Sequence, residues 1–109
     1  MSATSTLLVF TNCPDPASAD ALAAALVELR LAACVNVLAP CRSLYRWQGK
    51  VEQASEVPLL IKTTAGRYAA VEAEIRARHP YELPEIVAVP IEAGLPAYLQ
   101  WVQDETRPD

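Results

Sequence analysis

The order of apolar and polar positions along the chain predicts a mixture of strands and helices. Residues 7–10 form an apolar run with the length of a short buried strand. Asp15 followed by Pro16 is a typical helix start, with a capping side chain before a proline in the first turn. Leucines and alanines then recur at helical spacing and predict an amphipathic helix that ends at Leu31 or Ala32.

A long β-hairpin is predicted for residues 34–62, with its turn at Gln48-Gly49. Pro40 interrupts the outgoing arm and Pro58 interrupts the return arm. Because proline has no N–H to donate to a ladder, each proline implies an edge position or a bulge. Arms this long exceed the usual strand of about five or six residues. We therefore expect that a small domain cannot cover this hairpin by itself.

The second half of the chain adds one helix, one strand and a short terminal helix. Thr64 suits the cap of a second helix, and Pro80 closes that helix at His79. An apolar segment over residues 85–92 predicts the last strand. Pro96 then starts a C-terminal helix.

The resulting β-α-β-β-α-β order with a terminal helix is the split-βαβ plan of ferredoxin-like domains. We therefore predict an α+β fold in a single domain, residues 1–109, with two helices on one face of an antiparallel sheet. The other face and the far end of the hairpin, with Tyr45 and Trp47, would be left apolar and exposed. Exposed apolar surface beside unpaired strand edges normally leads to association, so we expect an obligate homo-oligomer.

Composition argues against several classes of protein. Hydrophobic residues make up 52% of the 109 residues and charged residues 20%, which is typical of a globular chain. The formal net charge of −4 argues against nucleic-acid or anionic-membrane partners, and no apolar run approaches the roughly 20 residues of a membrane span. The first residues lack the features of a signal peptide, so we predict a cytoplasmic protein. Three cysteines without a C-x-x-C spacing predict neither a disulfide framework nor a structural zinc site.

The residues for common catalytic chemistry are nearly absent from the sequence. A nucleophilic serine or cysteine needs a base within hydrogen-bond reach, and His79 is the only imidazole. Glu82 and Glu85 are three residues apart in an extended segment, which places them on opposite sides of it. Three glycines are too few for a glycine-rich phosphate loop. We therefore expect that the protein is not an enzyme.

Cys13 and His79 are the candidate metal ligands. Thiolate and imidazole are ligands that copper favours. Cys13 lies just beyond the first predicted strand and His79 ends the second predicted helix, and the ends of neighbouring elements converge in a ferredoxin-like fold. The pair is thus a candidate site for copper or another divalent cation. Alternatively, His79 is a solvated helix terminus, which the carbonyl end of the helix dipole stabilises when the ring is protonated.

A second candidate site is a pocket between subunits that binds a small molecule. Flat apolar rings and a few fixed charged groups are the usual components of a ligand site. The hairpin and the segment after His79 offer both kinds of side chain: Tyr45, Trp47, Glu56, Lys62, Tyr81, Glu82 and Glu85. Alternatively, Tyr45 and Trp47 serve only as anchors of a subunit interface, a role that aromatic residues often fill.

Several segments of the sequence resemble the CutA divalent-cation-tolerance proteins. The two longest are Ser-Leu-Tyr-Arg-Trp-Gln-Gly-Lys over residues 43–50 and His-Pro-Tyr-Glu-Leu-Pro-Glu-Ile over residues 79–86. The others appear in family order and extend the match over nearly the whole chain: residues 13–15, 31–36, 56–57, 61–63 and 98–101. The resemblance implies a ferredoxin-like protomer in a tight homotrimer, similar in architecture to the PII signalling proteins.

The same resemblance implies a role in divalent-cation tolerance, with copper binding and without enzymatic activity. The metal ligands proposed for the family are a cysteine near the end of the first strand and a histidine at the C-terminus of the second helix. His79 matches the histidine, whereas Thr11 stands at the cysteine position and Cys13 follows two residues later. Arg78 stands where the family often has a second histidine.

The leading hypothesis is therefore a homotrimer that acts by binding copper or another divalent cation, with Cys13 and His79 as ligands. An alternative hypothesis is a PII-like signalling trimer that senses a small ligand in the clefts between its subunits. A third hypothesis is a stable trimeric platform for a partner protein.

Overall fold

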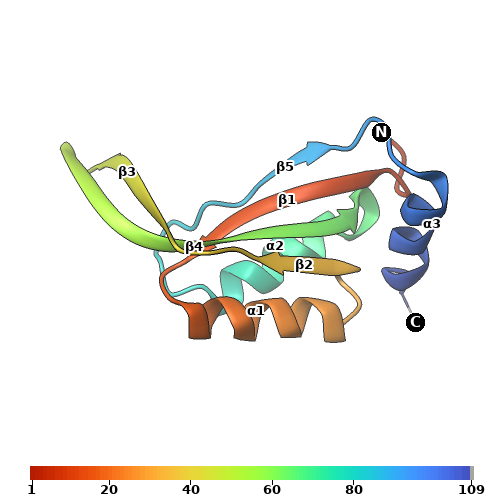
Figure 1. The fold of residues 1–109 in the computed structure, drawn as a ribbon, viewed down its shortest axis with the longest axis horizontal. Helices are drawn as coiled ribbons and strands as arrows, with labels where there is room; N and C mark the ends of the chain where they lie inside the picture. The colour runs from red at the N-terminus through yellow and green to blue at the C-terminus, as the bar shows by residue number, and fades with distance from the viewer. Residues whose placement is uncertain (109) are drawn as a thin grey trace.

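The computed structural model describes residues 1–108 and arranges them as a mixed α+β fold (Figure 1). The elements follow one another in the order β1 (Thr6–Cys13), α1 (Pro16–Glu28), β2 (Cys34–Val37), β3 (Cys41–Trp47), β4 (Lys50–Thr64), a 3₁₀ turn (Ala65–Arg67), α2 (Tyr68–Arg78), β5 (Val87–Pro90) and α3 (Pro96–Glu105). No helix within residues 1–108 is long and apolar enough to span a bilayer. The single domain predicted over residues 1–109 stays a prediction, and residue 109 lies outside the described part.

One antiparallel sheet carries the fold, with the strand order β2-β4-β1-β5 and with β3 paired to the outer half of β4. Helices α1 and α2 lie against the same face of this sheet, and α3 packs at its end (Figure 1). This is the ferredoxin-like arrangement that the order of elements predicts. The predicted fold class is therefore confirmed, while the predicted homotrimer stays a prediction.

The hydrophobic core lies between the sheet and the two helices. Val9, Leu59 and Ile61 on the central strands are 0% exposed, as are Leu26 on α1 and Ile75 on α2. Alternate residues of a strand point to opposite faces, so their neighbours along β1 and β4 lie on the face without helices. On that face the apolar side chains of Leu8, Phe10 and Leu60 are only partly covered by the chain itself.

The hairpin extends past the rest of the domain (Figure 1). Strand β4 has 15 residues, of which Val57 to Thr64 pair with β1, whereas its first residues pair only with β3. The outgoing arm is divided into β2 and β3 at Pro40, where residues 38–40 lie opposite Val57 and Pro58. This unequal pairing is a bulge, as the two prolines predicted. The Leu38 N–H still donates to the Pro58 carbonyl at 3.0 Å.

Helix α1 begins as predicted and ends earlier than predicted. Asp15 caps it, because its Oδ1 accepts hydrogen bonds at 2.7 Å from both the N–H and the hydroxyl of Ser18. The helix ends at Glu28, and Arg30 then adopts a left-handed conformation with φ of 59°. The Arg30 guanidinium donates to the Asp104 carbonyl at 3.0 Å, which connects this turn to the end of α3. The sequence prediction was wrong about this end because the contact comes from the far end of the chain.

The second helix also follows the predicted pattern with small differences. Thr64 stands at the predicted cap position, but its hydroxyl makes no capping hydrogen bond. Helix α2 ends at Arg78, and His79 is extended with ψ of 133° immediately before Pro80. Strand β5 is shorter than the predicted segment 85–92, because only Val87 to Pro90 pair with β1.

Replacing Leu26 by alanine should destabilise the fold much more than the same change at Leu29. Leu26 is fully buried between α1 and the sheet, so Leu26→Ala should lower the free energy of unfolding by about 2–5 kcal/mol. Leu29 is 50% exposed at the end of the same helix, so Leu29→Ala should change it by less than about 0.5 kcal/mol. Urea denaturation of both variants at one protein concentration measures the difference. Equal losses would contradict this placement of the core.

Candidate functional site

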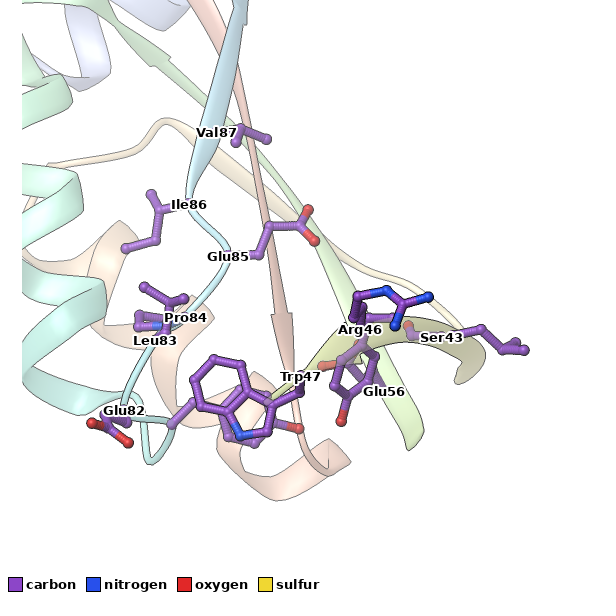
Figure 2. Close-up of a pocket in the computed structure, with 13 residues that line it drawn as sticks. Ser43, Arg46, Trp47, Glu56, Glu82, Leu83, Pro84, Glu85, Ile86 and Val87 are labelled. Atoms are coloured by element: carbon purple, nitrogen blue, oxygen red, sulfur yellow. The ribbon is translucent and has the colours of Figure 1, made fainter. Parts of the chain in front are cut away.

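A groove of about 980 Å³ runs between the β3–β4 ribbon and the extended segment that follows α2 (Figure 2). The residues that line it come from three stretches of the chain: Ser43, Leu44, Tyr45, Arg46, Trp47, Glu56, Tyr81, Glu82, Leu83, Pro84, Glu85, Ile86 and Val87. Figure 2 shows Leu83 to Val87 on one side, the ribbon with Arg46 and Glu56 on the other, and the indole of Trp47 between them. Sequence positions far apart thus meet in one concave surface.

The register of the hairpin sets which side chains face the groove. Tyr45 pairs with Glu52, Trp47 with Lys50, and Cys41 with Glu56. Because alternate residues share a face, Tyr45, Trp47 and Glu56 lie on the same face of the β3–β4 ribbon. The pairing of the two-stranded ribbon therefore places Tyr45, Trp47 and Glu56 on one face, and all three line the groove.

Prolines and one asparagine position the opposite wall. Pro80 and Pro84 fix their own φ angles, so the segment between them cannot continue α2. The Asn12 side chain, at the end of β1, donates a hydrogen bond to Glu85 Oε1 at 3.3 Å. The segment is therefore tied to the sheet at the mouth of the groove.

His79 anchors the beginning of this segment. Its Nδ1 accepts a hydrogen bond from the Tyr81 N–H at 3.1 Å, so its Nε2 carries the proton and donates to the Asn12 carbonyl at 2.5 Å. The imidazole also packs against the Tyr81 ring, with 4.7 Å between ring centres. Both ring nitrogens are engaged, and the observed role of His79 is to position the groove wall at the end of β1.

Glu56 is the buried charge of the site. It is 8% exposed and forms no ion pair within residues 1–108. The Tyr81 phenol lies beside it, and partial burial together with the charge of Glu56 raises the pKa of Tyr81 above its usual value. The groove therefore contains a carboxylate that no side chain within residues 1–108 pairs with as an ion pair.

Cys13 lies behind the groove and not on its surface. Its side chain is 2% exposed, and burial raises the pKa of its thiol to about 11, with smaller contributions from the charges of Asp15 and Glu56. The thiol is therefore protonated at neutral pH. Thr11, at the position of the family's cysteine, is also buried, and its hydroxyl makes no hydrogen bond to the described residues.

The predicted metal ligands lie at the same end of the sheet, because His79 bonds to the residue before Cys13. Within residues 1–108, no group of three or more His, Cys, Asp or Glu side chains is arranged to hold a metal ion. Both imidazole nitrogens are hydrogen-bonded within the chain, and the thiol of Cys13 is buried and protonated. One chain as described does not fit a metal ion at this pair, and the site at Cys13 and His79 stays a prediction.

Of the seven residues predicted for the pocket, six line the groove and one, Lys62, lies elsewhere on the sheet. Six line the groove: Tyr45, Trp47, Glu56, Tyr81, Glu82 and Glu85. Lys62 does not, because it is six residues farther along β4 than Glu56, a distance of about 20 Å at the usual rise per residue. Its Nζ instead donates to Asn36 Oδ1 on β2. Lys62 is therefore outside the groove of a single chain, and its place in a pocket between subunits stays a prediction.

The sequence prediction missed some residues that line the groove and one residue, Asn12, that holds its wall. Ser43 shares the ribbon face of Tyr45 and Trp47, so counting by two along the strand would have found it. Asn12 acts through its backbone carbonyl and its amide group, and no sequence pattern signals that role.

Cys13 should resist alkylation at neutral pH, whereas the exposed Cys41 should react. At pH 8, a thiol with a pKa of about 11 is thiolate in only roughly one molecule per thousand, and it is also buried. The reaction of Cys13 should accelerate as the pH rises towards 11, because the thiolate is the nucleophile. Iodoacetamide labelling of the folded protein with mass spectrometry measures both rates. Rapid labelling of Cys13 at pH 7 would contradict its burial.

Comparison with known sequences agrees with the motifs. The family described as CutA1 divalent ion tolerance protein matches residues 7–105. Protein CutA of Mus musculus is 45% identical over 98 residues, which are 90% of this chain and 55% of the mouse protein. The divalent-cation tolerance protein CutA of Thermus thermophilus is 44% identical over 99 residues, which are 91% of this chain and 96% of that protein. The chain thus spans about half the length of the mouse relative and nearly all of the bacterial one.

Comparison with solved structures gives the same result. The crystal structure of CutA from Xylella fastidiosa is similar with a TM-score of 0.92 and 47% identity, over 94% of this chain and 99% of that one. CutA1 from Thermus thermophilus is similar with a TM-score of 0.92 and 43% identity, over 94% and 99% of the two chains. In sequence and in fold, the chain belongs to the CutA1 divalent ion tolerance family.

Proposed function

We propose that this protein serves divalent-cation tolerance by binding a ligand as a homotrimer, without catalysing a reaction. The names of its relatives support the role in divalent-cation tolerance. A cytoplasmic location, as the sequence predicts, is part of this proposal.

The observation that carries a binding role is the groove with Glu56 at its wall. A ligand site needs a concave surface, apolar walls and a few fixed polar groups. The groove offers Tyr45, Trp47 and Tyr81 as apolar surface, and Glu56 and Glu85 as charged groups. This arrangement favours the PII-like alternative, in which a trimer senses a small ligand.

The surface that one chain leaves uncovered supports the proposed association into a trimer. Val87 is 51% exposed and Val89 is 46% exposed on the face of the sheet without helices. Leu44 and Val51, at the outer part of the hairpin, are 64% and 66% exposed. Apolar surface of this extent beside unpaired strand edges favours association. We therefore propose that the hairpin and the open face pack against neighbouring subunits.

Trp47→Asp should dissociate or unfold the assembly. A charged side chain at Trp47 would have to be buried without a partner if the ribbon packs between subunits. Light scattering at matched concentration should give the trimer mass for the wild-type protein and a lower mass, or aggregates, for the variant. Glu52→Gln, on the same face of the ribbon but outside the groove, is the control and should stay trimeric. A trimeric Trp47→Asp variant would refute the proposed packing of the hairpin.

Copper is the more specific version of the proposal, with Cys13 and His79 as its ligands. The chemistry of a thiol and an imidazole suits copper. Since both nitrogens of His79 are hydrogen-bonded and the thiol of Cys13 is buried and protonated, copper binding at this pair needs a change of local structure or a further ligand from a neighbouring subunit.

Calorimetric titration of the metal-free protein with copper tests this version. If the pair binds copper, the wild-type protein should bind it stoichiometrically, and His79→Ala should weaken the affinity at least about tenfold. Arg78→Ala, one residue away on the end of α2, is the control and should bind as the wild type does. Binding that is unchanged in His79→Ala would show that copper binds elsewhere or without a specific site.

A further inference from the structure

Within the described residues of one chain, the buried carboxylate of Glu56 has no positive partner. Glu56 is 8% exposed, and no lysine, arginine or histidine within residues 1–108 forms an ion pair with it. A buried charge without a partner is strongly unfavourable, so native proteins normally pair it or leave it for a ligand. Glu56 lines the groove, where a ligand can reach it.

Aromatic rings stand on both sides of this carboxylate. Tyr45 and Trp47 share its face of the ribbon, and Tyr81 approaches from the opposite wall. In a single chain Trp47 is 38% exposed and Tyr45 is 44% exposed, and both line the groove. The face of an aromatic ring carries negative potential and attracts cations, with tryptophan the strongest.

Most of the remaining charges in the groove are negative. Glu82 and Glu85 also line it, and Arg46 is the only cationic side chain among the lining residues. Three carboxylates against one guanidinium leave an excess of negative charge. The groove therefore attracts cations and repels anions such as phosphates or carboxylates.

We infer that the groove binds a small organic ammonium cation, with Glu56 as its counter-ion and Tyr45, Trp47 and Tyr81 as its aromatic walls. This inference rests on the proposed role of the groove as the ligand site, and it names the class of ligand. A divalent metal ion needs several oxygen, nitrogen or sulfur ligands, and the described residues provide no such cluster. An alkylammonium ion needs one carboxylate and apolar surface, which the groove provides.

The first experiment compares a cation with its neutral isostere. The assembled wild-type protein is titrated by calorimetry with choline and, separately, with 3,3-dimethyl-1-butanol, in which a carbon atom replaces the charged nitrogen. Choline should bind at a single site per chain, and the neutral compound should bind at least about tenfold more weakly. Equal affinity would overturn the role of charge, and the absence of choline binding would overturn the ligand class.

The second experiment tests Glu56 with a matched control. Glu56→Gln keeps the shape of the side chain and removes its charge, so it should weaken choline binding at least about tenfold. Glu52→Gln removes the same charge from the same face of β4 but lies outside the groove, so it should leave the affinity unchanged. Equal affinity in all three proteins would overturn the assignment of Glu56.

A further variant keeps the test decisive if Glu56→Gln does not fold. Tyr81→Leu retains apolar bulk and removes one aromatic wall, so it should weaken choline binding roughly threefold or more while the neutral isostere changes little. Choline affinity of the wild-type protein should also fall as salt is raised, because the attraction is electrostatic. Unchanged choline affinity in Tyr81→Leu would refute the proposal.

Failure of the ligand class can be distinguished from failure of the groove as a ligand site. If the assembled wild-type protein does not bind choline and Glu56→Gln keeps its mass in light scattering, only the ligand class is refuted. If Glu56→Gln dissociates the assembly while Glu52→Gln does not, a neighbouring subunit fills the groove, and both proposals for it fail.

Discussion

The whole structure depends on the pairing of strand β4 along its full length. Its inner half lies between β1 and β2 and closes the hydrophobic core, while its outer half pairs only with β3. Strand β4 is therefore part of the sheet that the helices cover and also part of the two-stranded ribbon that extends beyond them. The core holds the inner half rigidly, and this fixes the direction in which the ribbon leaves the domain. The groove exists because that direction brings the ribbon near the segment after α2.

The site combines two ways of fixing a side chain. On the ribbon, the ladder of β3 and β4 sets the face on which Trp47 and Glu56 lie. On the opposite wall, no ladder exists near Tyr81, and the segment is instead positioned by prolines and by the hydrogen bonds of His79. The two hydrogen bonds of the His79 ring thus fix the position of an irregular segment, as backbone hydrogen bonds fix the position of a strand. These hydrogen bonds give His79, immediately before Pro80, a structural role that does not require a metal ion.

The sequence was sufficient to predict the fold, because local patterns and the split-βαβ order agree with each other. The capping role of Asp15 and the bulge at Pro40 follow directly from side-chain chemistry. Features set by distant contacts were not predictable. The early end of α1 depends on Arg30 meeting the carbonyl groups at the end of α3, and the distance of Lys62 from the groove depends on the length of β4. Residue types indicated the members of the site, but only the register of the hairpin shows which of them face each other.

The order of the strands also has a consequence for how the chain folds during synthesis. Strand β1 leaves the ribosome first, yet Thr6 pairs with Thr64 and Leu7 pairs with Pro90, so both of its partners are made much later. The β3–β4 ribbon, in contrast, closes over a short turn and can form as soon as it is made. The central apolar residues of β1 therefore stay unpaired with β4 and β5 while the ribbon forms. The ribbon is the natural early structure, and the central sheet assembles around β4 only when the chain is nearly complete.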